Sequence, residues 1–359
     1  MSVRRIIQSF YDWQQTGEAM VLATVYETAG STYSKAGQRI LIRGNAIYQG
    51  LVSGGCLEAD LAERARVVLE TGEPVAVTYD MRDDGEDLFG LGVGCDGMIR
   101  VFLQTLDQET AYEPFASIAR LTLTDKASSV ATVIASDNPD LPPGATLVWN
   151  GTPADLQPPA SPALERLVAG CEAVYVSGSA RFETGEDGLA VLYAPLNPVP
   201  RLLVLGAGLD AVPVVGMAAE LGWRVSIADH RPAYLANNEF VGAERVVLVE
   251  PAALDREFSV GDFDAVIVMS HHLATDQIYL MQLATLDLPY IGVLGPPARR
   301  DRLVNALGES GKALGARLRG PVGLDIGADS PESIALSLLA EIHLVLKQQA
   351  PHVARNVRE

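Results

Sequence analysis

An apolar run that ends in glycines, residues 202–211 with the sequence LLVLGAGLDA, constrains the fold of this chain more than any other feature. Its start is typical of a buried strand, and Gly206, Gly208 and Ala211 have the G-x-G-x-x-A spacing that leads from a strand into a helix. The glycines allow a tight turn and the approach of a pyrophosphate, and the alanine allows close helix packing. A second apolar strand ends at Asp229, whose carboxylate could accept a hydrogen bond from a ribose hydroxyl. This order predicts a Rossmann-type nucleotide-binding fold.

The same alternation of strand and helix continues to about residue 350, which predicts a parallel sheet. Strands are predicted at residues 202–205, 224–228, 245–249, 265–269 and 290–294, and helices at 211–221, 275–286 and 331–347. We therefore predict a C-terminal Rossmann-type parallel-sheet domain over residues 201–350.

The N-terminal half, residues 1–195, is predicted to form a separate α/β domain. A helix is predicted at residues 3–13 and strands at 19–26, 39–42, 74–79, 98–103 and 146–149. A glycine-rich elbow with the sequence LVSGGCLE, residues 51–58, leads into a further helix through Leu69, and an acidic, glycine-rich loop follows at 83–97. Three prolines before Arg201 mark the expected domain boundary.

Composition narrows the classes of function. The formal net charge of −18 over 359 residues disfavours binding to a nucleic-acid backbone or an anionic membrane, since both require clustered Lys and Arg. The uninterrupted apolar stretches are shorter than the roughly 20 residues of a membrane span. The N-terminus does not resemble a signal peptide, and three cysteines without C-x-x-C spacing suit a reducing compartment. We expect a cytoplasmic protein.

Two cysteines lie in glycine-rich surroundings that suit a thiolate ligand. Cys56 follows Gly54 and Gly55 at the predicted start of a helix, where the helix dipole lowers a thiol pKa. A thiolate is a soft ligand for a thiophilic metal. The alternative is a small buried apolar residue, the commonest fate of a free cysteine. Cys95 stands between Gly94 and an aspartate, and the same two interpretations apply to it.

The predicted nucleotide site has two further polar features. His271 and His272 follow a strand end, where α/β sheets bind their ligands, so one of them could face the cleft. Either histidine could instead be held by backbone hydrogen bonds. Asp210 stands where a pyrophosphate would approach, and its carboxylate would repel that group unless it turns away.

Several segments together resemble the XdhC/CoxI family, the accessory factors of xanthine dehydrogenase and related molybdenum hydroxylases. They are GSTY (30–33), GLVSGGCLE (50–58), GVGCDG (92–97), MSHH (269–272), YIGVLG (290–295) and PVGLDIGA (321–328). Two positions depart from the family pattern: Asp96 replaces a glycine, and Leu209–Asp210 replaces a His-Val pair.

The resemblance implies a chaperone rather than a turnover enzyme. Such a protein binds the molybdenum cofactor, as molybdopterin or a dinucleotide form, while a cysteine desulfurase-type sulfurtransferase sulfurates it, and then delivers it to a xanthine dehydrogenase-type hydroxylase. By resemblance, Cys56 would be the metal ligand, and Ser53, Gly54, Gly55 and Cys95 would contact the cofactor. We also expect a homodimer.

One alternative is an NAD(P)-dependent oxidoreductase, and another is a non-catalytic binding module in which Asp210 and Asp96 have removed the capacity to bind ligands. The glycine fingerprint and Asp229 support the oxidoreductase, but no acid/base set such as Tyr-x-x-x-Lys is recognisable near the expected cleft. Whether the protein is a chaperone or an oxidoreductase, the fingerprint glycines, Ala211, Asp229 and His271 are the predicted nucleotide-site residues.

Overall fold

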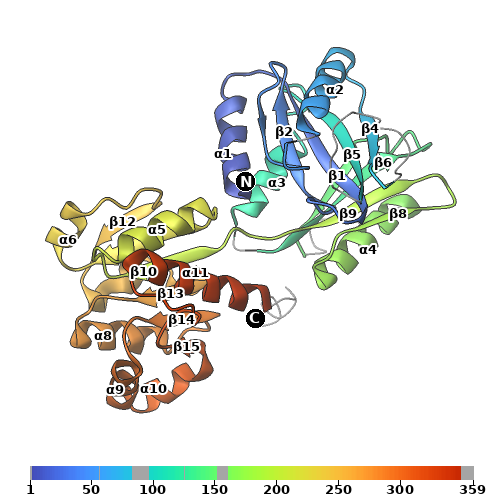
Figure 1. The fold of residues 1–359 in the computed structure, drawn as a ribbon. Coiled ribbons are helices and arrows are strands. Elements are labelled where there is room, and N and C mark those ends of the chain that lie inside the picture. Colours follow the sequence, from blue (N-terminus) through green and yellow to red (C-terminus); the bar gives the residue numbers. More distant parts are fainter. Residues whose placement is uncertain (1, 56, 83–96, 125, 152–160, 349–359) are drawn as a thin grey trace. The chain divides into compact units, whose positions relative to one another are not determined.

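The computed structural model describes residues 2–55, 57–82, 97–124, 126–151 and 161–348, and these form two compact units (Figure 1). The boundary between the units falls between Pro198 and Val199. We call residues up to Pro198 the N-terminal unit and those from Val199 the C-terminal unit.

The N-terminal unit contains two antiparallel sheets. The first has the strand order β3-β2-β1-β5-β4 and the second the order β7-β6-β9-β8. The strands are β1 (Met20–Gly30), β2 (Arg39–Arg43), β3 (Tyr48–Gln49), β4 (Val75–Asp80), β5 (Gly97–Leu106), β6 (Ser128–Ala135), β7 (Thr146–Trp149), β8 (Arg181–Thr184) and β9 (Ala190–Leu196). The helices are α1 (Val3–Gln14), α2 (Glu58–Thr71), α3 (Phe115–Thr122) and α4 (Pro162–Ser177).

Alternating apolar residues bury both faces of each sheet in this unit. Helix α2 covers one face of the first sheet through Leu61 and Val68. The opposite face packs with α1, α3 and the second sheet, and the rings of Tyr26 and Phe182 meet there at 4.9 Å. Helix α4 covers the outer face of the second sheet.

The C-terminal unit is the predicted parallel sheet, with the strand order β12-β11-β10-β13-β14-β15. Its strands are β10 (Arg201–Leu205), β11 (Arg224–Asp229), β12 (Arg245–Leu248), β13 (Ala265–Val268), β14 (Tyr290–Val293) and β15 (Leu318–Arg319). Its helices are α5 (Ala211–Glu220), α6 (Pro232–Asn237), η2 (Pro251–Ala253), α7 (Leu254–Glu257), η3 (Val260–Asp262), α8 (Leu273–Leu283), α9 (Pro297–Leu307), α10 (Glu309–Leu314), η4 (Gly315–Arg317) and α11 (Pro331–Gln348). The strand order reverses between β10 and β13, the switch point at which such sheets bind ligands.

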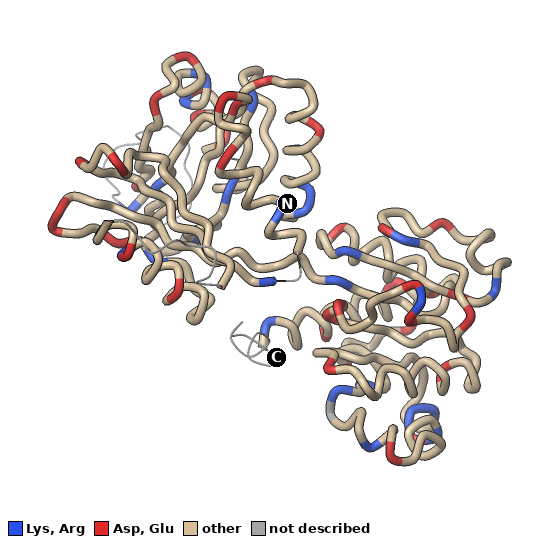
Figure 2. The backbone as a smooth tube through the Cα atoms, turned by 180° about the vertical axis from the view of Figure 1, so that it is seen from behind, with Lys and Arg blue, Asp and Glu red and all other residues tan. Residues whose placement is uncertain are grey.

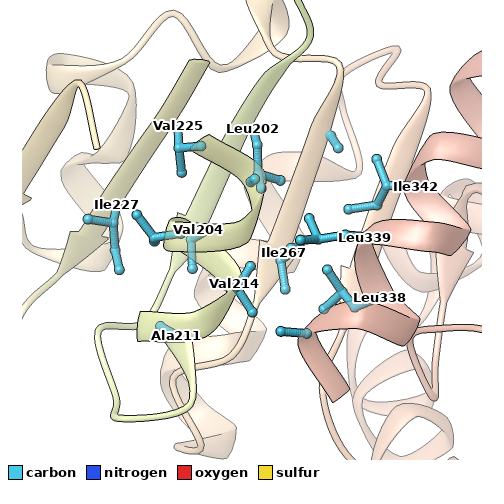
Figure 3. Packing of buried hydrophobic residues seen from close by; sticks show 14 of the residues in the cluster. Leu202, Val204, Ala211, Val214, Val225, Ile227, Ile267, Leu338, Leu339 and Ile342 are labelled. Carbon is cyan, nitrogen blue, oxygen red and sulfur yellow. The ribbon is translucent and has the colours of Figure 1, made fainter. Parts of the chain in front are cut away.

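Successive residues of the central strands point to opposite faces of this sheet. Leu202 and Val204 on β10 pack against α5 and α11, where Val214 and Leu338 lie in the same cluster (Figure 3). Leu203 and Leu205 enter the cluster on the other face, with α7 and α8. A strand buried on both sides explains the continuous apolar run in the sequence.

The sequence missed part of the N-terminal unit. Strands β6, β8 and β9 and helix α4 were not predicted. The three strands form the second sheet together with β7, the only strand of that sheet that the sequence predicts, and α4 covers the sheet. Strand β8 is short and half exposed, so its residues carry little alternation. The elements that were predicted appear with ends displaced by a few residues, as helix and strand boundaries commonly are.

The distribution of charged residues and the composition of the helices bear on whether the protein binds nucleic acid or a membrane. Acidic and basic residues are interspersed along the chain in both units (Figure 2). None of the helices in these ranges is both long enough and apolar enough to cross a bilayer.

Replacing Gly206 by alanine should destabilise the C-terminal unit by at least about 2 kcal/mol. Gly206 has a φ of +126°, and an added Cβ would lie 2.5 Å from the backbone carbonyl of Met269. In the matched control, Gly216→Ala inside α5, the Cβ meets nothing within 4 Å and should add roughly 0.5–1 kcal/mol of stability. Denaturant unfolding of both full-length variants measures this, and equal effects would contradict the close approach.

Candidate functional site

The elbow before α2 is organised by one buried carboxylate. Glu58 is fully buried, and its Oε1 accepts hydrogen bonds from the backbone N–H groups of Val52 (2.8 Å) and Ser53 (3.0 Å). Its Oε2 accepts from the Ser53 hydroxyl (2.7 Å) and the Gly55 N–H (2.9 Å). The Ser53 hydroxyl oxygen in turn accepts from the Leu57 N–H at 2.7 Å. The first residue of the helix therefore holds the preceding turn in place.

Gly54 and Gly55 form the exposed tip of this turn. Their φ angles are +81° and +118°, a region that other residues rarely adopt. A Cβ built on either glycine would meet no atom of the described residues within 4 Å. The glycines thus serve the backbone conformation, and among the described residues the space above the turn is open to a bulky ligand. Cys56, the predicted metal ligand, lies outside the described residues, as does Cys95 with its neighbour Asp96.

The segment that begins at Gly30 contacts both this elbow and Gly97, the described end of the segment 92–97. Ser34, which is fully buried, donates its hydroxyl hydrogen bond to the carbonyl of Val52 at 2.5 Å. Gly97 pairs with Gly30, and a Cβ on Gly97 would collide with the backbone of Ser31. The segment 30–34 therefore lies between the elbow and the start of β5.

The hydrogen bonds to Glu58 keep it ionised. Burial alone would raise the pKa of its carboxyl group, but the hydrogen bonds from Ser53 and Val52 outweigh burial and lower the pKa below its usual value. The elbow consequently contains a fixed negative charge beneath its exposed glycines.

In the C-terminal unit, Asp229 holds the glycine loop after β10. Its side chain is fully buried, and Oδ2 accepts from the Ala207 N–H at 2.7 Å. Arg231 donates from Nε to Oδ1 (2.9 Å) and from Nη2 to Oδ2 (2.7 Å). Burial alone would raise the pKa of the Asp229 carboxyl group, but the hydrogen bonds from Arg231 and Ala207 outweigh burial, so the pKa lies below its usual value. A ribose hydroxyl, which was predicted to bind here, would have to share this carboxylate with Arg231.

A histidine–aspartate pair links the loops after β10 and β13. His271 Nε2 lies 2.7 Å from Asp210 Oδ2. The hydrogen bond with Asp210 raises the pKa of His271, against burial and the charge of Arg299. His271 also has a φ of +61°, which is uncommon for a residue with a side chain and is often found at functional sites. Of the two histidines, His271 is the one that contacts the glycine loop after β10.

His272 has a structural role. Its Nδ1 accepts a hydrogen bond from the Thr275 N–H at 3.4 Å and so caps α8. Behind it, Asp276 is buried and joins Ser270 Oγ (2.5 Å) to Arg299 Nη2 (2.6 Å). The sequence analysis included Ser270 only as part of the segment MSHH and did not single out Asp276 or Arg299. They lie in three separate segments, and only the folded sheet brings them together.

The predicted site residues therefore form two groups. Gly206, Gly208, Ala211, Asp229 and His271 lie together at the carboxyl ends of β10, β11 and β13. Ser53, Gly54 and Gly55 lie in the N-terminal unit. The third cysteine, Cys171, is fully buried in α4, and burial raises its thiol pKa to about 12. Within the described ranges, no group of three or more His, Cys, Asp and Glu residues is placed to hold a metal ion.

Comparison with known proteins decides the family. Residues 13–80 match the XdhC and CoxI family, and residues 202–342 match the XdhC Rossmann domain. The chain is 32% identical to a probable xanthine dehydrogenase subunit of Bacillus subtilis (strain 168), over 93% of this chain and 95% of that protein. This chain belongs to the XdhC and CoxI family.

Two further proteins agree with this assignment. The chain is 25% identical to the molybdenum cofactor insertion chaperone PaoD of Escherichia coli (strain K12), over 96% of this chain and 89% of that one. A crystal structure described as a xanthine dehydrogenase from Bacillus halodurans superposes with a TM-score of 0.73 at 27% identity, covering 98% of this chain and 97% of that one. The predicted family and the predicted Rossmann-type half are both confirmed.

Replacing Glu58 by glutamine should destabilise the protein by at least about 2 kcal/mol. The glutamine amide has only one acceptor oxygen. Its NH2 group would therefore take the place of one carboxylate oxygen and face the N–H or O–H groups that now donate hydrogen bonds to that oxygen. In the matched control, Glu70→Gln, an exposed helix position loses only a surface ion pair with Arg66, and stability should stay near that of the wild type. Comparable losses in the two variants, measured by denaturant unfolding, would contradict the role of Glu58.

The contribution of Glu58 should also depend on pH with a defined sign. Because the folded state lowers the pKa of Glu58, its stabilisation is fully present above the unfolded value of about 4.3 and is lost as the pH falls through the lower folded value. The difference in unfolding free energy between wild type and Glu58→Gln should therefore be constant from about pH 7 to pH 5 and shrink below about pH 4. A difference that grows on acidification would mean that burial dominates instead.

Proposed function

We propose that this protein is a molybdenum cofactor chaperone that holds the cofactor at the elbow of its N-terminal unit and delivers it to a xanthine dehydrogenase-type molybdenum hydroxylase. The observation that supports this most directly is the exposed Gly54–Gly55 turn, held open by the buried Glu58 and followed by Cys56. Relatives that span nearly the whole chain are named for xanthine dehydrogenase and for molybdenum cofactor insertion. They favour this function over the NAD(P)-dependent oxidoreductase.

In this proposal the cofactor is cargo, and it supplies the metal centre of the hydroxylase that receives it. The residues of this chain hold the cofactor and prevent its release into solvent. The Cys56 thiolate is the soft ligand for molybdenum, Cys95 adds a second thiol, and Ser53, Gly54 and Gly55 shape the turn. The cofactor is molybdopterin in its mononucleotide or dinucleotide form.

The partners follow from the same proposal. A cysteine desulfurase-type sulfurtransferase sulfurates the bound cofactor, the hydroxylase then receives it, and the chaperone acts as a homodimer in the cytoplasm. We assign nucleotide binding to the C-terminal unit, with the loop from Gly206 to Ala211, Asp229 and His271 as its site.

The test compares serine substitutions at two cysteines: Cys56, the proposed molybdenum ligand, and Cys171, which is buried in α4. Cys56→Ser should fold normally but lose molybdenum and pterin, by on the order of tenfold or more, because the soft ligand is gone. Cys171→Ser replaces a buried thiol by a hydroxyl, so it should lower stability by about 1–3 kcal/mol while the folded fraction keeps its cofactor. Melting temperature and metal and pterin content of anaerobically purified protein decide between them.

A well-folded Cys56→Ser protein that retains molybdenum and still activates the hydroxylase would overturn the proposed role of Cys56. Capture of the wild-type protein from a native host supplies the second readout. Recovery of neither a molybdenum hydroxylase nor a sulfurtransferase would count against the chaperone function itself.

A further inference from the structure

The aspartate in the glycine loop lies at the place where an anionic ligand would bind. A Cβ built on Gly208 would lie 2.5 Å from Asp210 Oδ1, so the carboxylate folds back over this glycine. Its other oxygen is held by His271 at 2.7 Å. Gly208 is the fingerprint residue whose missing side chain normally admits a pyrophosphate. The protein thus places its own anion over the position that the loop keeps open.

The surrounding backbone favours an anion at this point. The N–H groups of Gly208, Leu209 and Asp210 donate to no acceptor among the described residues. They precede α5, whose N-terminal dipole attracts negative charge. The carboxylate of Asp210 accepts from none of these N–H groups and is held instead by His271, so the groups stay available to a ligand anion.

A buried tyrosine hydroxyl near Asp229 and Asp276 also has no partner among the described residues. The hydroxyl of Tyr279 on α8 is fully buried and has no hydrogen-bond partner in the described part of the chain. Burial raises the pKa of Tyr279, and the nearby charges of Asp229 and Asp276 raise it further. Buried polar groups in folded proteins are nearly always paired, so a partner from outside the chain is expected here.

We propose that Asp210 is a specificity-determining gate of the nucleotide site: a pyrophosphate-bearing ligand binds only by displacing the Asp210 carboxylate from His271 and from the loop. In the bound state His271 pairs with the ligand phosphate, and Asp210 turns to solvent. This deepens the proposed nucleotide site, and it explains how an acidic residue can stand in a phosphate-binding loop. The self-occupied site binds nucleotides weakly and rejects short anions that gain too little from the exchange.

The charges around His271 agree with such an exchange. The hydrogen bond with Asp210 is the largest influence on the pKa of His271, ahead of burial, and the charges of Arg299 and the buried Asp276 follow in that order. Asp276 is already bonded to Arg299 and Ser270, so it does not compete for His271. Asp210 is the partner that a ligand can replace, because its side chain is 23% exposed.

The experiment titrates ADP into the full-length protein at pH 6.0, below the ordinary histidine pKa of about 6.5. Asp210→Asn keeps the size of the side chain and removes the competing charge, so it should bind ADP at least about tenfold more tightly than the wild type, a change of about 1.4 kcal/mol. The control Asp255→Asn removes an exposed charge from α7 and should leave the affinity unchanged. Unchanged or weaker ADP binding by a folded Asp210→Asn protein would overturn the gate.

A second variant tests the exchange of partners. Adding His271→Gln to Asp210→Asn should remove most of the gained affinity, because the ligand phosphate would lose its cationic partner. If the double variant binds ADP as tightly as Asp210→Asn, His271 is not the group that is exchanged. Molybdenum and pterin content of the same variants should remain at the wild-type level. An ADP result that overturns the gate therefore does not affect the proposed chaperone function. Loss of molybdenum and pterin by these variants would contradict the proposal that the nucleotide and the molybdenum cofactor bind at separate sites.

Discussion

Two buried carboxylates hold the loops of the two candidate sites, and the geometry of both sites depends on them. Glu58 accepts from Val52, Ser53 and Gly55, and Asp229 accepts from Ala207 and Arg231. A loop that must stay open to a ligand cannot be held by a core of its own side chains. Backbone N–H groups need acceptors when they leave regular structure, and a carboxylate can satisfy several of them at once.

Different groups offset the cost of burying the negative charge of each carboxylate. A buried charge is unfavourable unless it is hydrogen-bonded or paired. Glu58 relies on N–H and O–H donors alone and therefore keeps its negative charge at the elbow. Asp229 adds the guanidinium of Arg231, which neutralises it. The carboxyl end of the parallel sheet is thus electrostatically available to an anion except where Asp210 occupies it.

The loops after β10 and β13 depend on each other. Gly206 packs directly on the peptide between Met269 and Ser270, which leaves no room for a side chain. This approach brings the glycine loop within reach of His271 and permits the bond to Asp210. An aspartate in the fingerprint is consequently tolerated, because the neighbouring loop supplies its partner. Sequence analysis identified Asp210 as an obstacle to pyrophosphate but could not show where its carboxylate turns.

The sequence by itself determined the Rossmann-type half, because a strand buried on both faces and a glycine turn are local patterns in adjacent residues. It also determined the family, through the segments that carry the elbow and the histidines. Only the tertiary structure decided that Glu58 is a buried acceptor, that His272 caps a helix while His271 meets Asp210, and that Asp276 joins Ser270 to Arg299. These contacts link residues on different loops, and their formation depends on how strands far apart in the chain pair, which no local pattern records.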